Sequence, residues 1–172
     1  MANPEEIVDI VDEADNILYQ IPKREAHERG LLHRTAIGEI IDSQGRWVLV
    51  QQAPGKQEVG QFVSPVGGHV SAGETEDEGL KREAKEECGL SDFKFKPVGK
   101  KIFNRNILGR QENHYFILYE IYSDMAVTLN EESVSYRFFT EQEIKDALKN
   151  TPKLFGNSFH FQVKTFYPNL LD

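Results

Sequence analysis

The sequence predicts an α+β fold, in which several strands surround one strongly amphipathic helix. Strand-like runs recur along most of the chain, and helical stretches do not alternate regularly with them, which argues against repeated βαβ units. The length of 172 residues fits one hydrophobic core, and a composition of 39% hydrophobic residues is ordinary for a globular chain. We therefore expect a single domain over residues 1–172.

The N-terminal half is expected to be mostly strand. Residues 5–23 contain two β-rich runs that meet at the turn-forming stretch DEADN, and a short helical or looped segment broken by Gly30 follows. Two further strands are expected at Thr35–Ile41 and Trp47–Gln51, joined by the turn DSQG. A loop rich in glycine and proline then covers residues 53–74.

The clearest helix is expected from Glu76 to Cys88. Thr75 and Glu78 have the spacing of a capping box, and the acidic first turn complements the positive end of the helix dipole. Gly89 stands at the position where helices commonly end.

The C-terminal half is expected to return to strands and to end in two helices. The strands are expected at Phe93–Phe103, His114–Ser123 and Val134–Phe139. Thr140 is placed to cap a helix over EQEIKDALKN, and a last helical stretch is expected near NSFHFQVKTFY.

Charge and cysteine content exclude several classes of function. A formal net charge of −8 argues against a nucleic-acid polymer or an anionic membrane surface as the main partner. The chain shows neither a signal-peptide pattern nor a run of 18 apolar residues, so we expect a cytoplasmic protein. A single cysteine, Cys88, excludes an internal disulfide and a multi-cysteine zinc cluster.

The stretch REAKEECGL, Arg82–Leu90, crowds three glutamates onto one helix. At about 100° per residue, Glu83, Glu86 and Glu87 fall within roughly a quarter turn, beside the apolar stripe of that helix. Like charges at this spacing repel, and either neighbouring lysines on a solvated face or a bound divalent cation would offset the repulsion. The spacing alone leaves both explanations open.

The residues upstream of the helix complete a longer motif. Gly68, five residues, Glu74, seven residues and then REAKEECGL match every fixed position of the Nudix box, with Ala84 in an apolar position. The chain therefore resembles the Nudix hydrolases over residues 68–90. That resemblance implies the Nudix fold, a mixed β-sheet sandwiched between α-helices, and hydrolysis of a nucleoside diphosphate linked to a variable group.

The resemblance also implies a metal site. In the family, residues matching Glu83, Glu86 and Glu87, with the carbonyl of the residue matching Gly68, hold Mg²⁺ or Mn²⁺. Carboxylate and carbonyl oxygens are the donors that such hard cations prefer. The implied partner is a small-molecule diphosphate, which the cation would help to neutralise.

The remaining box residues have implied roles as well. Arg82 and Glu74 match residues that fix the helix against the preceding loop in the family. Either Glu86 or Glu83 is expected to accept the proton of the attacking water. The implied catalytic set is therefore Glu74, Arg82, Glu83 and Glu86.

Segments outside the box resemble a second family. VDEADN, AHERGLLHR, GHV and TPKLFGNSFHF follow one another as in the isopentenyl-diphosphate isomerases, which share the Nudix fold. This looser resemblance implies that residues 1–33 form an N-terminal extension packed on the domain. This chain is expected to be a monomer or a homodimer.

The isomerase resemblance implies a second metal site, for Mn²⁺ or Zn²⁺. His27, His33 and His69 correspond to metal-binding histidines there, and Glu132 is expected to supply a carboxylate ligand. Glu132, or Glu131 before it, would also have to serve if the enzyme uses a second catalytic carboxylate. Two histidines match nothing in that family and are expected to be structural: His114 and His160.

Several departures favour a hydrolase over an isomerase. The isomerases need a cysteine just before the GH pair, where this chain has Gly67, and Cys88 lies too far along the helix to replace it. Their Nudix box is degraded, whereas this one is whole. Basic residues that would grip the diphosphate are partly replaced by Gln51 and Gln52. An isomerase-like enzyme and a catalytically silent nucleotide-binding module remain the alternatives.

Substrate binding is expected from loops. Arg105 and Arg110 lie in a segment, Phe103–Glu112, that we expect to be a loop able to bind phosphates. Lys56 is a further basic residue in the glycine-rich loop, and Phe62 is expected to stack on a base there.

Overall fold

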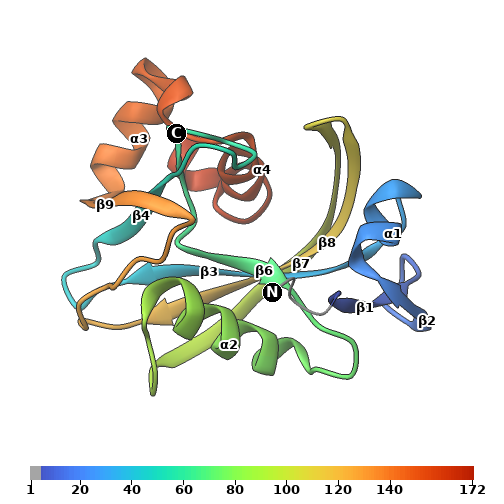
Figure 1. Ribbon diagram of the computed structural model, residues 1–172. Helices are drawn as coiled ribbons and strands as arrows, with labels where there is room; N and C mark the ends of the chain where they lie inside the picture. Colours follow the sequence, from blue (N-terminus) through green and yellow to red (C-terminus); the bar gives the residue numbers. More distant parts are fainter. Residues whose placement is uncertain (1–4) are drawn as a thin grey trace.

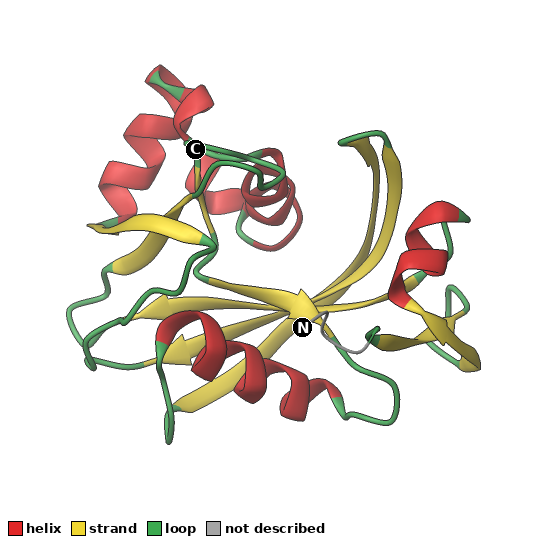
Figure 2. Cartoon of the chain, in the orientation of Figure 1, coloured by secondary structure: helices red, strands yellow, loops and turns green. Residues whose placement is uncertain are grey.

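The computed structural model describes residues 5–172 and shows a nine-stranded mixed sheet with helices on both faces (Figure 1). The strands are β1 (Ile7–Val11), β2 (Ile17–Pro22), β3 (His33–Ile41), β4 (Trp47–Gln52), β5 (Phe62–Val63), β6 (Val66–His69), β7 (Lys94–Ile107), β8 (Arg110–Tyr122) and β9 (Ser133–Phe139). The helices are α1 (Lys23–Glu28), α2 (Glu76–Cys88), α3 (Glu141–Asn150) and α4 (Asn157–Phe166). The expected α+β class is confirmed, and the strands form a layer between α2 on one face and α3 with α4 on the other (Figure 2).

Strand β3 organises the sheet. It pairs with β8 in parallel, with β6 antiparallel, with β4 through a tight turn, and with β1 at its first residues. The register places His33 opposite His114 on β8 and Thr35 opposite His69 on β6. Three histidines from separate parts of the chain are thereby brought to one end of β3.

Helix α2 begins at Glu76 and ends at Cys88, as predicted. The capping box forms: Thr75 N–H donates to Glu78 Oε2 at 2.8 Å, and Glu78 N–H donates to Thr75 Oγ1 at 3.2 Å. Gly89 ends the helix in the left-handed conformation, with φ of 66°. These contacts are all local, which explains why the bounds follow from the sequence.

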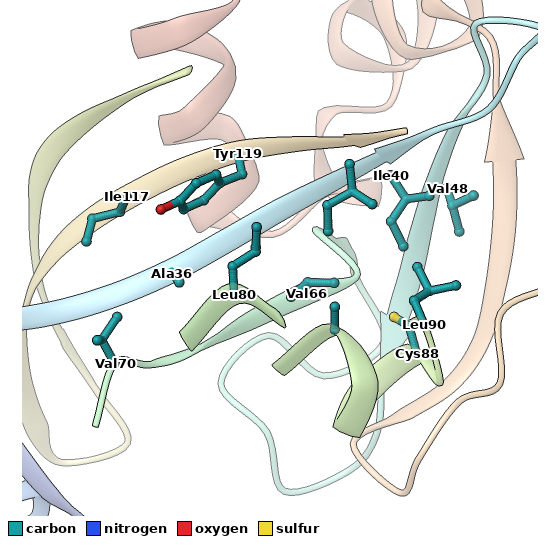
Figure 3. Close-up of a cluster of buried hydrophobic side chains, with 12 residues drawn as sticks. Ala36, Ile40, Val48, Val66, Val70, Leu80, Cys88, Leu90, Ile117 and Tyr119 are labelled. Carbon is teal, nitrogen blue, oxygen red and sulfur yellow. The ribbon is translucent and has the colours of Figure 1, made fainter. Parts of the chain in front are cut away.

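The apolar stripe of α2 fills one core of the protein. Leu80, Ala84 and Cys88 are fully buried, and they pack against Ala36 and Ile117 on the sheet (Figure 3). Burial of this stripe fixes the rotation of α2, so the residues beside it are held at the edge of the sheet.

A second core lies under α3 and α4, and it contains Phe62. The prediction that Phe62 stacks on a base is wrong, because β5 pairs with β4 and turns the ring inward. Its centroid lies 5.5 Å from that of Phe139.

The segment Phe103–Glu112 is not a loop, contrary to the prediction. Strands β7 and β8 stay paired out to Ile107 and Arg110, and the turn consists of Leu108 and Gly109 alone. Both turn residues have positive φ, 52° and 73°, which suits a two-residue hairpin turn. Among residues 5–172, no helix is long and apolar enough to cross a membrane.

Candidate active site

A cleft of about 600 Å³ runs past the whole of β6 and past the side of α2 that carries Arg82, Glu83, Glu86 and Glu87. One part of its wall, here called the carboxylate end, carries the acids Glu83, Glu86, Glu87 and Glu132. Another part, the histidine end, carries His27, His69 and His114. The cleft is therefore lined by residues from both of the metal sites expected from the sequence.

The backbone at Gly68 and the side chain of Glu83 occupy adjoining space. A Cβ atom added to Gly68 would overlap the Glu83 carboxylate, so only glycine leaves room for this acid. Burial raises the pKa of Glu83, and hydrogen bonds from Arg82 oppose the rise. The first glycine of the motif is thus explained by the close approach of a carboxylate to the strand.

Arg82 ties the helix to the preceding loop. Its Nε donates to Glu74 Oε1 at 2.7 Å, and Nη2 donates to Glu74 Oε2 at 3.1 Å and to the carbonyl of His69 at 2.9 Å. Its Nη1 donates to Glu83 at 2.7 Å and contacts Glu86 at 3.4 Å. All five N–H groups of the guanidinium are therefore directed at protein acceptors.

The two remaining glutamates of the helix differ in exposure. Glu87 is half-buried and accepts a hydrogen bond from Gly67 N–H at 3.1 Å. Burial, followed by the charges of Glu83 and Glu132, raises the pKa of Glu87 to about 10. Glu86, with 55% of its side chain exposed, faces the cleft with the fewest constraints.

This set of donors suits a divalent cation. Besides burial, the charge of Glu83 raises the pKa of Glu87, and the charge of Glu86 raises that of Glu83, so Arg82 compensates the acids of this helix only in part. A hard cation with oxygen ligands would offset that charge. Because position 68 is a glycine, the backbone could approach a cation bound there.

Glu132 lies at the carboxylate end and not with the histidines. Its carboxylate forms a short ion pair with Lys56, and its charge acts on Glu87. The prediction that Glu132 shares a site with His27, His33 and His69 is corrected accordingly. The residue lies in the turn before β9, and β9 pairs with β4 on the far side of β3 from β8.

The three predicted histidines do come together, and a fourth joins them. The group consists of His27, His33, His69 and His114, whose ligating nitrogens all lie within 4.8 Å of one another. The prediction that His114 is merely structural missed this cluster.

Burial lowers the pKa of all four imidazoles. The pKa of His27 falls to about 4, with nearby positive charge adding to the effect of burial. Burial also lowers the pKa of His33, and it lowers those of His69 and His114 well below the ordinary value. All four rings are therefore neutral at neutral pH, and each has a lone pair on one nitrogen.

The two arginines predicted to bind phosphate line the cleft but are engaged by buried acids. Arg105 donates to Glu112 at 3.0 Å and to Glu58 at 2.9 Å, and Arg110 donates to Glu112 at 2.7 Å. Glu58 also accepts from the N–H of Ser158 at 2.8 Å, at the start of α4. Neither Glu58 nor Glu112 was singled out from the sequence. Arg105 and Glu58 are 47 residues apart, and the contact of Arg105 with Glu112 depends on the register of β7 with β8.

The cysteine is excluded from the cleft. Cys88 is fully buried and its thiol donates to the carbonyl of Pro65 at 3.3 Å. Burial raises the pKa of this thiol to about 12. Gly67, which does line the cleft, has no side chain to take part in chemistry.

Comparisons with known proteins agree with both resemblances. A family model described as the NUDIX domain matches residues 31–157. An uncharacterized Nudix hydrolase of Streptomyces coelicolor is 34% identical over 86% of this chain and 82% of its own length. An isopentenyl-diphosphate Delta-isomerase of Serratia proteamaculans is 29% identical over 88% of this chain and 86% of its own length. The crystal structure of DR0079 from Deinococcus radiodurans has the same fold, with a TM-score of 0.75 and 21% identity over 94% of this chain and 99% of that one.

Proposed function

Because the chain belongs to the Nudix family, we propose that it hydrolyses a pyrophosphate bond in a small molecule with Mg²⁺ or Mn²⁺ at the carboxylate end of the cleft. The observation that carries the proposal is the Arg82 network. It holds a complete set of box carboxylates against a cleft of about 600 Å³, a size typical of small-molecule sites.

Glu83, Glu86 and Glu87 would hold the cation, with the backbone at Gly68 beside them. The bound cation would neutralise the diphosphate and lower the pKa of the attacking water. Glu87 keeps its position through the hydrogen bond from Gly67, and Glu83 keeps its own through Arg82.

Glu86 is our assignment for the base. Its side chain is the most exposed of the three, and a single contact of 3.4 Å to Arg82 leaves it free to reach a water in the cleft. It would take the proton of that water as the water oxygen attacks phosphorus and the bridging P–O bond breaks. Glu132 is a weaker assignment because it is paired with Lys56.

Arg82 and Glu74 would act as positioning residues. Each N–H of Arg82 is directed at Glu74, Glu83, Glu86 or the His69 carbonyl, which leaves no free donor for a substrate. Hydrogen bonds from Arg82 and from Ser71 N–H lower the pKa of Glu74 against the opposing effect of burial, so this acid stays charged and holds the arginine.

The substrate we propose is a nucleoside diphosphate linked to another group. The wall of the cleft is predominantly polar, and it carries four cations that a phosphate could attract away from the acids they are paired with: Lys23, Lys56, Arg105 and Arg110. Apart from the histidines, Phe116 is the one aromatic side chain on the wall formed by the described residues, and it is 4% exposed. A base would accordingly be held by polar contacts more than by stacking.

An isomerase activity has some support, from the Serratia proteamaculans relative. Proton transfer at carbon would need an acid or a base where this chain has Gly67. Cys88 cannot supply it, because its thiol is buried and directed at Pro65. We therefore favour the hydrolase.

We further propose that residues 1–172 act as one domain, with residues 1–33 as an extension packed on it. The pairing of β1 with β3 and the contact of α1 with β8 support this. The net charge of −8 argues against a nucleic-acid polymer or an anionic membrane surface as the partner. Gel filtration would decide between a monomer and a homodimer.

The test is a hydrolysis assay with Mg²⁺ and, separately, Mn²⁺. Nucleotide sugars, dinucleotides, ADP-ribose and nucleoside triphosphates are incubated with the protein, and release of phosphate or nucleoside monophosphate is measured. We expect turnover that falls at least about 100-fold in Glu86→Gln, as is typical for loss of a general base. Glu141→Gln, an exposed acid on α3, is the matched control and should keep wild-type activity. Absence of turnover across the panel, together with isomerisation of isopentenyl diphosphate, would refute the proposal.

A further inference from the structure

Three polar side chains, here called the relay, link the interior of the protein to the cleft. Ser64, between β5 and β6, is within hydrogen-bond distance of Glu39 on β3 and of Gln162 on α4. Ser64 and Gln162 line the cleft, whereas Glu39, at 1% exposed, is enclosed by the protein. The relay is therefore closed at Glu39 and can meet a ligand at Gln162.

The single hydroxyl proton of Ser64 determines the state of its neighbours. Its Oγ lies 3.1 Å from Gln162 Oε1 and makes a short hydrogen bond with Glu39 Oε1. A hydroxyl donates one proton, and both neighbouring oxygens can only accept unless the acid is protonated. Both hydrogen bonds exist together only when Glu39 donates to Ser64 and Ser64 donates to Gln162.

The surroundings of Glu39 favour the protonated acid. Its Oε2 is buried without a hydrogen-bond partner, which is costlier for a charged carboxylate than for a neutral acid. Burial raises the pKa of Glu39 to about 8, the hydrogen bond with Ser64 opposes the rise, and the charge of Glu120 adds to it. Glu39 therefore carries its proton at neutral pH.

The charged and titratable groups near Glu39 do not neutralise it. Glu120 lies opposite Glu39 in the parallel pairing of β3 with β8, and of the described residues it is the one whose charge acts on Glu39. Glu120 itself accepts from Tyr122 at 2.6 Å and from Tyr167 at 2.7 Å. Lys96, on β7, is an ion-pair partner of Glu120 at 3.8 Å. The partner that Glu39 contacts directly is thus the neutral hydroxyl of Ser64.

We propose that Gln162 is a specificity-determining residue of the cleft and that Ser64 and Glu39 are positioning residues for its amide. With Glu39 protonated, the oxygen of the amide faces Ser64, and the residues described by the structure offer its N–H groups no acceptor, so these groups are left for a ligand in the cleft. With Glu39 ionised, Ser64 must donate to the carboxylate, and the amide turns so that its nitrogen donates to Ser64. The cleft then meets the carbonyl oxygen of Gln162 instead of its N–H groups.

The ligand that fits Gln162 is an uncharged oxygen acceptor. The cations of the wall come from α1, β7, β8 and the loop after β4, whereas α4 contributes the neutral side chains of Ser158 and Gln162. Phosphates are attracted to the cations and to a metal ion at the carboxylate end, so a neutral donor suits a carbonyl or hydroxyl oxygen of the nucleoside or of the group linked to it. This choice of ligand rests on the proposed function, whereas the positioning of the amide does not.

The first experiment follows the amide by NMR in the wild-type protein without ligand or metal. The side-chain amide signals of Gln162 are identified by their loss in Gln162→Met, and ¹³C-labelled glutamate reports the ionisation of Glu39. The pH is raised from about 6.5 until Glu39 ionises. We expect the Gln162 signals to shift with the same midpoint as Glu39, and to stay constant in Glu39→Gln. A Glu39 that is already ionised at the start, or Gln162 signals that do not follow its ionisation, would overturn the proposal.

Variants of Ser64 test whether its hydroxyl links the two residues. Ser64→Thr keeps the hydroxyl and should keep the linked shift. In Ser64→Ala, Glu39 should ionise without a change in the Gln162 signals, because no group joins the two side chains. A linked shift of equal size in Ser64→Ala would show that the charge of Glu39 moves the signals through space, and would contradict the relay.

The second experiment measures the contact with the ligand, using the best substrate of the hydrolysis panel. Gln162→Met should raise KM about 3–10-fold with little change in kcat, because one hydrogen bond between neutral groups is lost. Gln142→Met, at an exposed position of α3, is the matched control and should keep the wild-type KM. The KM of the wild type should rise as Glu39 ionises, and Glu39→Gln should not show this rise.

The outcomes separate this proposal from the proposed hydrolysis. An unchanged KM in Gln162→Met, or the same pH dependence of KM in Glu39→Gln as in the wild type, would refute the ligand contact. If the panel gives no turnover, the proposed hydrolysis fails. Dissociation constants of the same molecules, from calorimetry, then take the place of KM, and the NMR shifts decide the positioning of the amide as before.

Discussion

The overlap between Gly68 and Glu83 gives a sharp test of the carboxylate end. In Gly68→Ala the new methyl group would occupy the space of the Glu83 carboxylate, and β6 cannot withdraw easily because Gly68 is paired with Ala36 in the sheet. The Glu83 carboxylate would have to swing aside and give up its hydrogen bond from Arg82, which costs about 1–3 kcal/mol. For a chain of 172 residues that corresponds to a Tm lowered by roughly 2–12 °C.

The adjacent glycine supplies the matched control. A Cβ added to Gly67 meets no atom within 4 Å, and neither glycine has a left-handed φ, so backbone strain is the same in both variants. Gly67→Ala should change stability by less than about 0.5 kcal/mol. The measurements are thermal unfolding without added metal and the Mg²⁺ concentration needed for half-maximal hydrolysis. We expect Gly68→Ala to need roughly 10–100 times more Mg²⁺, since Glu83 is displaced. Equal Tm values and equal Mg²⁺ requirements for the two variants would refute the steric explanation.

Three other predictions concern buried groups away from the cleft chemistry. Leu80→Ala should lower the free energy of unfolding by about 2–5 kcal/mol, because Leu80 is 0% exposed between α2 and the sheet. Leu18 is 56% exposed, so Leu18→Ala should change the free energy of unfolding by less than about 0.5 kcal/mol. Urea unfolding measures both values, and equal losses would contradict the assignment of Leu80 to the core. Burial raises the pKa of Glu39 to about 8 from 4.5, so the folded state binds more protons than the unfolded state between these values and stability falls as pH rises through them. Glu39→Gln should therefore unfold at a higher Tm than wild type at pH 8.5 and at nearly the same Tm at pH 4.5, and a difference that does not grow with pH would argue against a buried ionisation. Cys88 should resist iodoacetamide at pH 8 in the native protein and react readily in urea, because it is fully buried and burial raises its thiol pKa to about 12. Fast labelling of the native protein would show instead that the thiol is accessible.

The sequence by itself determined the features that depend on neighbours along the chain. The bounds of α2 follow from the Thr75 capping box and from Gly89, and the turn between β1 and β2 follows from Asp12, whose carboxylate accepts from the N–H groups of Ala14 and Asn16. The motif from Gly68 to Leu90 likewise identified the family, because its spacing is read directly from the chain.

Other features were decided by partners that are distant in sequence. Phe62 was expected at the surface, and pairing of β5 with β4 buries it. Arg105 was expected in a loop, and pairing of β7 with β8 sets it against Glu112. In both cases a hydrogen-bonded strand partner, which no local pattern reveals, fixes the direction of the side chain.

The histidine cluster shows most clearly which features follow from the sequence and which require the tertiary structure. Resemblance supplied His27, His33 and His69, but placed Glu132 with them and left His114 aside. Only the parallel pairing of β3 with β8 puts His114 opposite His33, while pairing of β9 with β4 carries Glu132 to the carboxylate end. The sequence therefore determined which chemical groups the chain contains and how its local elements begin and end. The tertiary structure decided which groups meet, because strand register across 81 residues, from His33 to His114, is set by the whole sheet.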